Sequence, residues 1–345
     1  MAKAKTLTKG QARRIKANQA KKLRNKAEQI TWQDDELGEA QHGTVISRFG
    51  QHADVEDEQG NIFRCNLRRS IQSLVCGDKV LWRQGKATEH SISGVIEAVH
   101  PRDSVLSRPD VYDGVKPIAA NISQILIVSS VLPAFNADII DRYLVAAEQT
   151  NIRPVIILNK IDLLTEQTRQ QIEQQLAIYR EIGYQILFVS NKSQEGIEQL
   201  KKQLQDNVSI FVGQSGVGKS TLTNSLMPKL QVETKEVSEN SGLGQHTTTV
   251  ARLYHFNDGG DLIDSPGIRE FGLWHLTAEQ VYHGFIEFSD YLGGCKFRDC
   301  KHQSDPGCAL VAAAKDNNIH PERLASFQRI LASLSSNTLT SRFND

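Results

Sequence analysis

The sequence predicts a chain of three units: a small β-barrel, a central α/β unit on a parallel sheet, and a short, mainly helical C-terminal unit. Three observations carry this prediction. Short alternating apolar and polar segments, separated by glycines, fill residues 43–99. Continuous apolar segments then alternate with helical patterns over residues 122–212. Finally, three cysteines and a histidine cluster within residues 295–308.

The N-terminal arm, residues 1–40, opens with a basic stretch. The chain has 345 residues with 40 Lys plus Arg and 40 Asp plus Glu, yet residues 1–27 hold ten basic side chains and no acidic one. Such an arm is expected to be disordered when free and suits a polyanion. A solvated tail that only aids solubility is the alternative. The sequence contains no run of eighteen apolar residues, so it predicts no membrane-spanning helix.

Residues 41–100 are expected to form a five-stranded barrel of the oligonucleotide-binding kind, with strands around residues 44–47, 61–65 and 79–82. Two interpretations of its side chains stay open. Phe63 and Trp82 either stack RNA bases or belong to the core, and the nearby arginines either face RNA or are simply solvated. Residues 101–116 are polar, contain Pro109 and Gly114, and are expected to be a linker.

The central unit is expected over residues 117–273. Residues 122–131, 154–158 and 185–189 are apolar enough for strands buried on both faces of a parallel sheet. A helix is expected at residues 137–149, a second begins after the N-cap Thr165 and stops at Gly183, and a third is capped by Ser193.

A phosphate-binding loop follows the next strand, residues 209–212. Its sequence fits G-x-x-x-x-G-K-[ST] in full and precedes a helical segment. Backbone N–H groups of such a loop surround phosphate, Lys219 reaches the β- and γ-phosphates, and Ser220 offers a hydroxyl to Mg²⁺. The predicted phosphate-binding residues are Gly213, Gln214, Ser215, Gly216, Val217, Gly218, Lys219, Ser220 and Thr221.

A second motif indicates guanine. Asn159-Lys160-Ile161-Asp162 follows an apolar strand, so it lies at the edge where ligands bind in parallel sheets. The carboxylate of Asp162 matches the guanine N1–H and exocyclic amine, which adenine does not offer. Asn159 is expected to steady the base and the phosphate loop. Further contacts to the base are expected from the tripeptide after the next strand, Ser190, Asn191 and Lys192.

Two further segments are expected at the γ-phosphate and Mg²⁺. Asp264-x-x-Gly267 follows a short apolar strand, which places Asp264 near the magnesium and the Gly267 amide near the γ-phosphate. The loop at residues 242–249 is rich in glycine and threonine and can order around the ion. Thr248 is the favoured magnesium ligand, with Thr247 the rival.

The C-terminal unit, residues 274–345, contains Cys295-x₄-Cys300-x-His302-x₅-Cys308. Three thiolates and one imidazole form a complete tetrahedral set for one structural Zn²⁺, with no position left for catalysis. A positive surface around the metal suits an RNA backbone; it comprises Lys296, Arg298, Lys301 and His320. Leu324, Phe327, Ile330, Leu331 and Leu334 form an apolar helical face that is expected to pack within this unit.

The order of the motifs is unusual, because the base-reading segment at Asn159 precedes the phosphate loop. With a barrel before and a zinc pattern after, the chain closely resembles the ribosome small-subunit-dependent GTPase A (RsgA/YjeQ) family of circularly permuted GTPases. The resemblance covers nearly all residues from Gly43 onward. It implies a cytoplasmic enzyme that hydrolyses GTP to GDP and phosphate, acts in late small-subunit maturation, binds that subunit and its rRNA, and is stimulated by it.

One position departs from the common GTPase pattern. Ile268 follows the glycine of the D-x-x-G segment, where a glutamine often orients the attacking water. The resemblance implies His246 as the catalytic substitute. Two alternatives stay open: an RNA-binding module with GTP as a structural ligand, or a GTPase that acts on another RNA or the large subunit. We expect a monomer without membrane contact, in a reducing cytoplasm because five cysteines give no disulfide framework.

Overall fold

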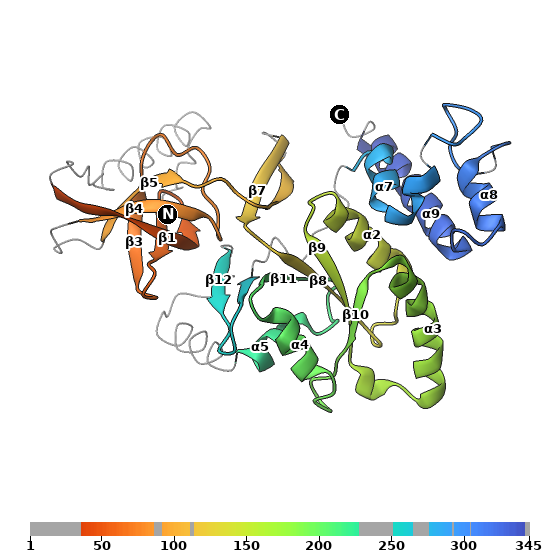
Figure 1. Ribbon diagram of the computed structural model, residues 1–345, viewed down its shortest axis with the longest axis horizontal. Helices are drawn as coiled ribbons and strands as arrows, with labels where there is room; N and C mark the ends of the chain where they lie inside the picture. The colour runs from red at the N-terminus through yellow and green to blue at the C-terminus, as the bar shows by residue number, and fades with distance from the viewer. Residues whose placement is uncertain are drawn as a thin grey trace, which may run out of the picture.

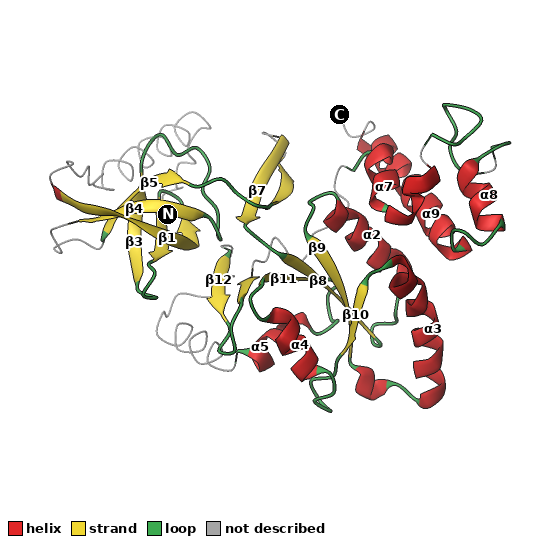
Figure 2. Ribbon diagram, in the orientation of Figure 1, coloured by secondary structure: helices red, strands yellow, loops and turns green. Residues whose placement is uncertain are grey.

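The computed structural model describes residues 36–85, 92–110, 114–227, 251–264, 276–291, 293–303 and 305–341. The strands of the barrel lie at one end, the main sheet and its helices in the middle, and a helical unit at the other end (Figure 1). Strands make up the end of the molecule with the barrel, and helices make up the opposite end (Figure 2). The predicted fold class, a β-barrel followed by a permuted α/β unit and a helical cysteine-rich unit, is confirmed.

The N-terminal barrel closes because its long first strand pairs with both the second and the fourth. Val45, Val55, Cys65, Trp82 and Ile96 are each fully buried inside it. The first strand starts four residues before the expected boundary at residue 41. The strands are β1 (Leu37–Phe49), β2 (His52–Glu56), β3 (Ile62–Leu67), β4 (Lys79–Gly85) and β5 (Gly94–Val99).

Trp82 belongs to the core, so the interpretation of its ring as a base-stacking surface is wrong. The ring is fully buried and packs on Phe63 with ring centroids 4.8 Å apart. Two glycines make room for it: a Cβ on Gly43 would lie 2.9 Å from the indole nitrogen, and one on Gly94 3.1 Å from the ring. Among the arginines, Arg64 keeps a side chain that is 51% exposed and forms an ion pair with Asp54 at 2.9 Å.

The segment predicted as a linker carries strands β6 (Val105–Asp110) and β7 (Gly114–Ala120), which pair with each other. The connection is fixed to the barrel. Asn121 donates its side-chain amide to the Gly77 carbonyl at 2.8 Å, and Arg102 bonds the buried carboxylate of Asp78 through two nitrogens. The chain between barrel and sheet therefore contains paired strands and is hydrogen-bonded to the barrel at Gly77 and Asp78.

The central sheet runs in the order β10, β9, β8, β11, β13, β12. All neighbours are parallel except the β12–β13 pair at the edge next to the barrel. The bounds are β8 (Gln124–Ser130), β9 (Arg153–Asn159), β10 (Gln185–Phe188), β11 (Val208–Val212), β12 (Arg252–His255) and β13 (Asp261–Asp264).

Helices cover both faces of this sheet, as the apolar strands predict. One core cluster joins the strands to α2 (Ala137–Glu148) and α3 (Glu166–Ile182). The other joins them to α4 (Ile197–Leu204) and α5 (Lys219–Leu226). Apolar residues of the strands therefore belong to one or the other of two apolar layers, which explains the continuous apolar runs in the strand sequences.

The predicted ends of α3 are correct, whereas the predicted start of α4 is wrong. Thr165 caps α3 through its side chain, and Gly183 ends it in the left-handed region at φ 113°. The N-cap of α4 is Gly196, not Ser193. A Cβ at Gly196 would lie 1.9 Å from the Phe188 carbonyl oxygen, so the turn there admits only glycine. Ser193 instead belongs to the loop after β10, where its N–H donates to the Ser190 hydroxyl.

The barrel and the sheet meet at one edge. Ser47 of β1 pairs with Arg252 of β12, and His255 bridges the two units. Its Nδ1 lies 2.6 Å from Asp261 and its Nε2 lies 2.8 Å from Glu56 of β2. Carboxylates only accept, so both ring nitrogens must carry protons. The hydrogen bond to Asp261 and the charge of both acids raise the pKa of His255 to about 9.

The C-terminal unit consists of α7 (Ala278–Gly284), the 3₁₀ turn η3 (Ile286–Tyr291), α8 (Ala309–Lys315) and α9 (Pro321–Ser341). Leu324, Phe327 and Ile330 are buried in its core, which confirms that this face of α9 packs within the unit. Arg323, 2% exposed, joins the unit to the central one: it bonds Glu287 of η3 at 2.6 Å and also the buried Asp141 of α2.

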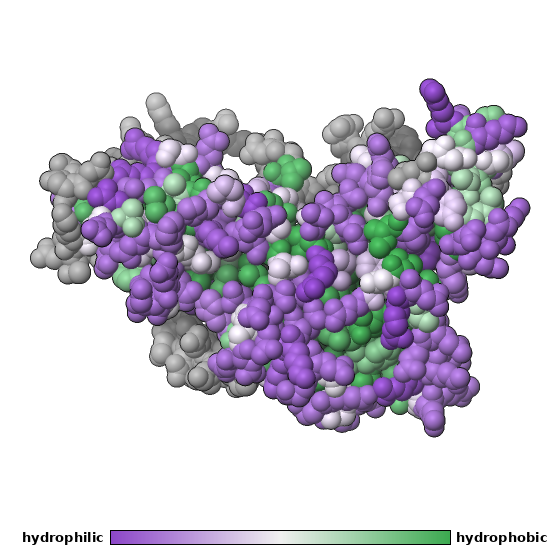
Figure 3. Space-filling view, viewed as in Figure 1, coloured by the Kyte–Doolittle hydropathy of each residue, from purple (hydrophilic) through white to green (hydrophobic). Residues whose placement is uncertain are grey.

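Hydrophilic residues dominate the face of the molecule in Figure 3, with smaller apolar areas over the centre. Among the described residues, no helix combines the length and the apolar character that a membrane span requires.

Candidate nucleotide site and metal centre

The phosphate loop has the backbone that its glycines predict. It connects β11 to α5, and Gly213, Gly216 and Gly218 have φ of 140°, 81° and 98°. A Cβ at Gly213 would lie 2.2 Å from the Val128 carbonyl oxygen of β8, and one at Gly218 would lie 2.4 Å from the Asn159 side-chain nitrogen. Two of the three glycines are therefore needed for close approach as well as for backbone conformation.

Lys219 is held inside the curve of this loop. Its Nζ donates to the carbonyl oxygens of Gly213 at 2.5 Å and Gln214 at 2.6 Å. Gln214, Ser215 and Ser220 are exposed on the loop. The ammonium therefore lies against the phosphate loop at the N-terminus of α5, the position at which such loops bind phosphate.

The base-reading motif lies directly against the phosphate loop. Asn159, only 3% exposed, donates through Nδ2 to the Val217 carbonyl at 2.9 Å. Its Oδ1 accepts the backbone N–H of Lys160, and the Lys160 Nζ donates to the Gly216 carbonyl at 2.7 Å. Residues 58 positions apart in the chain thus form one connected surface, because β9 and β11 both neighbour β8 and end at the same edge of the sheet.

Sequence reasoning missed the loop between β8 and α2. The Leu132 carbonyl accepts the second hydrogen bond of the Lys160 ammonium at 2.6 Å. The Pro133 ring lies 3.8 Å from where a Cβ of Gly216 would be. The apolar run over residues 122–131 indicates a strand that ends at this edge, so the position of the loop could have been predicted. The contact itself could not, because every residue has a backbone carbonyl.

The segment after β10 is bonded to Asp162 and to α5. The buried Ser190 donates its hydroxyl to Asp162 Oδ1 at 2.6 Å and accepts the backbone N–H of Lys192 at 3.2 Å. Asn191 donates its side-chain amide to the Thr221 carbonyl of α5 at 3.2 Å. The carboxylate is thereby oriented by a hydroxyl that itself is held by the following loop.

The structure places some of the predicted nucleotide contacts and leaves others outside its description. Asp264 ends β13, the strand beside β11, at the edge where the phosphate loop begins. Gly267, His246, Thr247 and Thr248 lie outside the described residues, as does Ile268.

Replacing Gly213 with alanine is expected to weaken GTP binding by at least about 100-fold. The new methyl group would collide with a backbone oxygen of β8, which cannot move because β8 pairs with strands on both sides. Gly216→Ala is the matched control, with φ also positive but no atom within 3.8 Å of the methyl position. It should cost about 1–2 kcal/mol of local strain, or about tenfold in affinity. Calorimetric titration with GTP measures both, and equal losses would contradict the steric argument.

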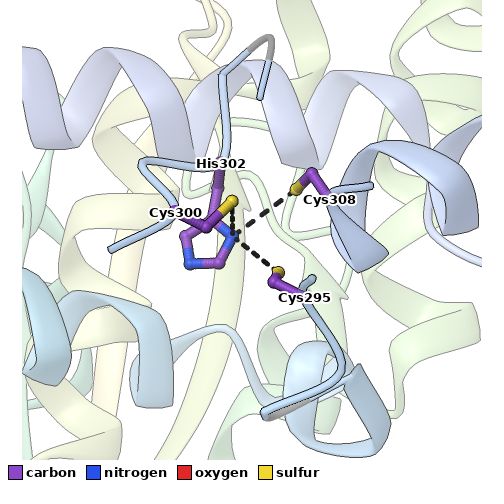
Figure 4. A group of neighbouring side chains, drawn as sticks. All are labelled: Cys295, Cys300, His302 and Cys308. Carbon is purple, nitrogen blue, oxygen red and sulfur yellow. Dashed lines mark hydrogen bonds between the residues drawn. The ribbon is translucent and has the colours of Figure 1, made fainter. Parts of the chain in front are cut away.

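A separate site lies in the C-terminal unit, where Cys295, Cys300, His302 and Cys308 converge (Figure 4). Their ligand atoms all lie within 4.8 Å of one another. The Nδ1 of His302 is 3.5 Å from Cys295 Sγ, 3.6 Å from Cys300 Sγ and 3.5 Å from Cys308 Sγ. The four residues predicted from the sequence are therefore brought together as a metal-binding cluster, with Nδ1 as the ligating nitrogen.

The spacing and the surroundings both fit a tetrahedral ion. Tetrahedral bonds of about 2.3 Å to sulfur and 2.0–2.1 Å to nitrogen place the nitrogen about 3.5 Å from each sulfur, as the three distances from His302 Nδ1 show. The His302 ring stacks on Tyr282 at 5.1 Å with an interplanar angle of 4°, and Gln328 bonds the His302 carbonyl at 2.7 Å. Burial lowers the pKa of His302, which favours the neutral imidazole that binds metals.

Comparison with known proteins agrees with this architecture. Residues 99–274 match the model of the RsgA GTPase family. The chain is 58% identical over 347 residues to the small ribosomal subunit biogenesis GTPase RsgA 1 of Vibrio parahaemolyticus, covering 100% of this chain and 98% of that protein. It is 58% identical over 336 residues to RsgA of Haemophilus influenzae strain Rd, covering 97% of both chains.

Two solved structures are also similar. The crystal structure of YjeQ from Thermotoga maritima has a TM-score of 0.69 at 31% identity, over 86% of this chain and 99% of that one. YloQ, a circularly permuted GTPase, has a TM-score of 0.68 at 26% identity, over 89% of this chain and 99% of that one. With the permuted order of the sheet and matches over the whole length, the chain is a GTP-hydrolysing enzyme and belongs to the RsgA GTPase family.

Proposed function

We propose that this GTPase acts in maturation of the small ribosomal subunit, binding GTP at the joint between the phosphate loop and the Asn159 segment. The observation that carries the proposal is the pair of hydrogen bonds from Asn159 and Lys160 to carbonyls of the phosphate loop. These bonds join the Asn159 segment, which contacts the base, to the phosphate loop, which contacts the phosphates. The names of the relatives, small ribosomal subunit biogenesis GTPases, supply the partner.

The roles of the residues follow from their chemistry. Asp162 accepts from guanine N1–H and the exocyclic amine, while Ser190 fixes its orientation. The N–H groups of the phosphate loop and the Lys219 ammonium hold the β- and γ-phosphates. When the nucleotide binds, the Lys219 ammonium moves from the loop carbonyls to a phosphate oxygen. The ammonium thereby exchanges two neutral hydrogen-bond acceptors for a charged one.

Magnesium is proposed at Ser220, with Asp264 and Thr248 nearby. Ser220 is exposed on the first turn of α5, and Asp264 ends the adjacent strand. Hard oxygen ligands of this kind would suit Mg²⁺, which would neutralise the negative charge that develops on the phosphates during hydrolysis. We propose zinc as the ion of the cysteine cluster, because three thiolates and one imidazole favour it.

We expect His246→Ala to leave GTP affinity unchanged and to abolish stimulated turnover. Ile268 cannot orient water, whereas a neutral imidazole can accept its proton. Calorimetric titration and phosphate release, with and without small subunits, measure the two effects. The neighbouring Gln245→Ala is the matched control in the same loop. Stimulated kcat that stays at the wild-type value in His246→Ala would remove the histidine from the mechanism.

The partner is tested by sedimentation of the full chain with purified small and large ribosomal subunits. We expect co-sedimentation with the small subunit only, stronger with a non-hydrolysable GTP analogue than with GDP, because γ-phosphate contacts at Gly267 reposition the following unit on its RNA. GTP hydrolysis should rise on addition of small subunits. Binding to the large subunit instead, or turnover that no subunit changes, would overturn the proposal. We expect the protein to act as a monomer in the cytoplasm.

A further inference from the structure

An exposed aromatic ring stands on the metal-bound loop of the C-terminal unit. Phe297 lies between the ligands Cys295 and Cys300 and is 46% exposed. Most other phenylalanines of this unit, such as Phe285, Phe288 and Phe327, are at most 1% exposed and form its core. The ring of Phe297 therefore faces solvent, although three other phenylalanine rings of this unit are buried. The unit forgoes the hydrophobic stabilisation that burial of Phe297 would give.

The loop holds this ring in place. Its two ends are fixed by the metal ligands, the Lys296 N–H donates to the Gly307 carbonyl at 3.0 Å, and the Cys300 N–H bonds the Phe297 carbonyl at 3.4 Å. Gly307 allows the close approach, because a Cβ there would lie 2.8 Å from the Lys296 Cβ. A ring presented from so short and constrained a loop loses little conformational entropy when it binds.

Three cations share the loop with this ring. The Lys296 ammonium lies 5.5 Å from the ring centroid, and Arg298 and Lys301 are exposed on the same loop. Within the part of the chain that the structure describes, no ion pair joins Arg298 or Lys301 to an acid, while Asp299 is the one carboxylate among these loop residues. An exposed aromatic ring with one cation over it and two more on the same loop matches a base and the phosphates that flank it.

We propose that Phe297 is a stacking platform for one unpaired RNA base, with Lys296, Arg298 and Lys301 on the adjoining phosphates. A duplex does not fit, because its base faces are already stacked; an unpaired nucleotide offers its whole π-face. This inference rests on the proposed function only in that the partner is RNA. It adds to that function a preference for single-stranded or bulged segments at the metal-bound loop.

The test compares Phe297→Leu with Phe297→Trp in the full chain. Leucine keeps an apolar side chain of similar size and removes the π-face, while tryptophan enlarges it. Fluorescence anisotropy measures binding to a labelled eight-nucleotide mixed-sequence RNA, single-stranded or annealed to its complement. We expect Phe297→Leu to weaken single-strand binding about tenfold and duplex binding by less than twofold, and Phe297→Trp to bind at least as well as wild type.

A second measurement locates the contact. The same RNA with 5-iodouridine, which crosslinks to stacked aromatic rings on irradiation, should label the peptide that contains residues 296–298 in the wild type and lose that label in Phe297→Leu. Metal content of one ion per chain in each variant shows that the loop is intact. Unchanged single-strand affinity in Phe297→Leu, an equal loss for the duplex, or labelling confined to the barrel would each overturn the stacking role.

The outcome separates this inference from the proposed function. If small subunits stimulate the wild type and Phe297→Leu equally and RNA binding is unchanged, the stacking role fails while the proposed function stands. If Phe297→Leu loses subunit affinity but keeps single-strand affinity, the ring contacts a ribosomal protein and the stacking role again fails. If no subunit binds the wild type while the RNA result is as expected, the proposed function fails alone.

Discussion

Asp162→Asn is expected to weaken GTP binding by about 1000-fold while leaving the fold intact. The guanine N1–H then meets a neutral acceptor in place of a charged one, and the exocyclic amine faces the asparagine NH₂ and has no acceptor; each of these two losses costs about 2 kcal/mol. The asparagine oxygen still accepts from Ser190, which holds Asp162 at 2.6 Å, so the loop after β10 keeps its position. Calorimetric titration of the purified variant with GTP and GDP measures the loss.

Xanthosine triphosphate distinguishes base reading from a general defect. Xanthine has an N1–H donor and an oxygen in place of the exocyclic amine, so the asparagine amide can accept from the first and donate to the second. Asp162→Asn should therefore bind this nucleotide more tightly than GTP, and the wild type the reverse. Glu166→Gln, the same change at an exposed residue of α3, should leave both affinities unchanged. Poor binding of every nucleotide by Asp162→Asn would mean that Asp162 supports the loop and does not read the base.

Cys308→Ser is expected to release the metal and unfold the C-terminal unit. Cys308 is 3% exposed and occupies the N-cap of α8, so its sulfur belongs both to the metal cluster and to the core. Structural zinc contributes about 10–16 kcal/mol to such small units at neutral pH. That exceeds the free energy that this small core supplies without the ion.

Metal analysis and limited proteolysis measure this effect. The wild type should hold one zinc per chain and Cys308→Ser less than a tenth of one, with rapid cleavage C-terminal to residue 276. Cys65→Ala is the control, since this thiol is fully buried in the barrel and lies outside the cluster. It should retain one zinc per chain. A Cys308→Ser protein with full zinc content and wild-type protease resistance would show that the cluster does not hold the unit together.

Helix α2 connects the two sites that these substitutions address. It begins five residues after Leu132, whose carbonyl holds the Lys160 ammonium at the phosphate loop. Along its length, Asp141 accepts from Arg323 of α9 and from the Tyr179 hydroxyl of α3 at 2.7 Å. Burial raises the pKa of Asp141, and the Arg323 charge opposes that shift. Breaking the pair by removing one partner would leave a buried charge without its counterpart, a loss of about 3–5 kcal/mol.

The sequence by itself determined the local chemistry. Residues 213–221 predict a phosphate loop because only glycine adopts the required backbone, and the cysteine pattern predicts a metal because thiolates so close together need a cation. Buried strands could also be predicted from the sequence, because an apolar run of five to seven residues has no face that suits solvent.

Only the tertiary structure decided which distant residues meet. Nothing in the sequence next to Trp82 distinguishes a base-stacking ring from a core ring; the glycines at 43 and 94, on two other strands of the barrel, make room for it. The sequence likewise did not predict three other contacts: the Leu132 carbonyl with Lys160, His255 with the barrel, and Arg323 with α2. The physical reason is common to all of them: a backbone carbonyl or a charged side chain finds its partner through strand order and helix packing, which the identities of neighbouring residues do not encode.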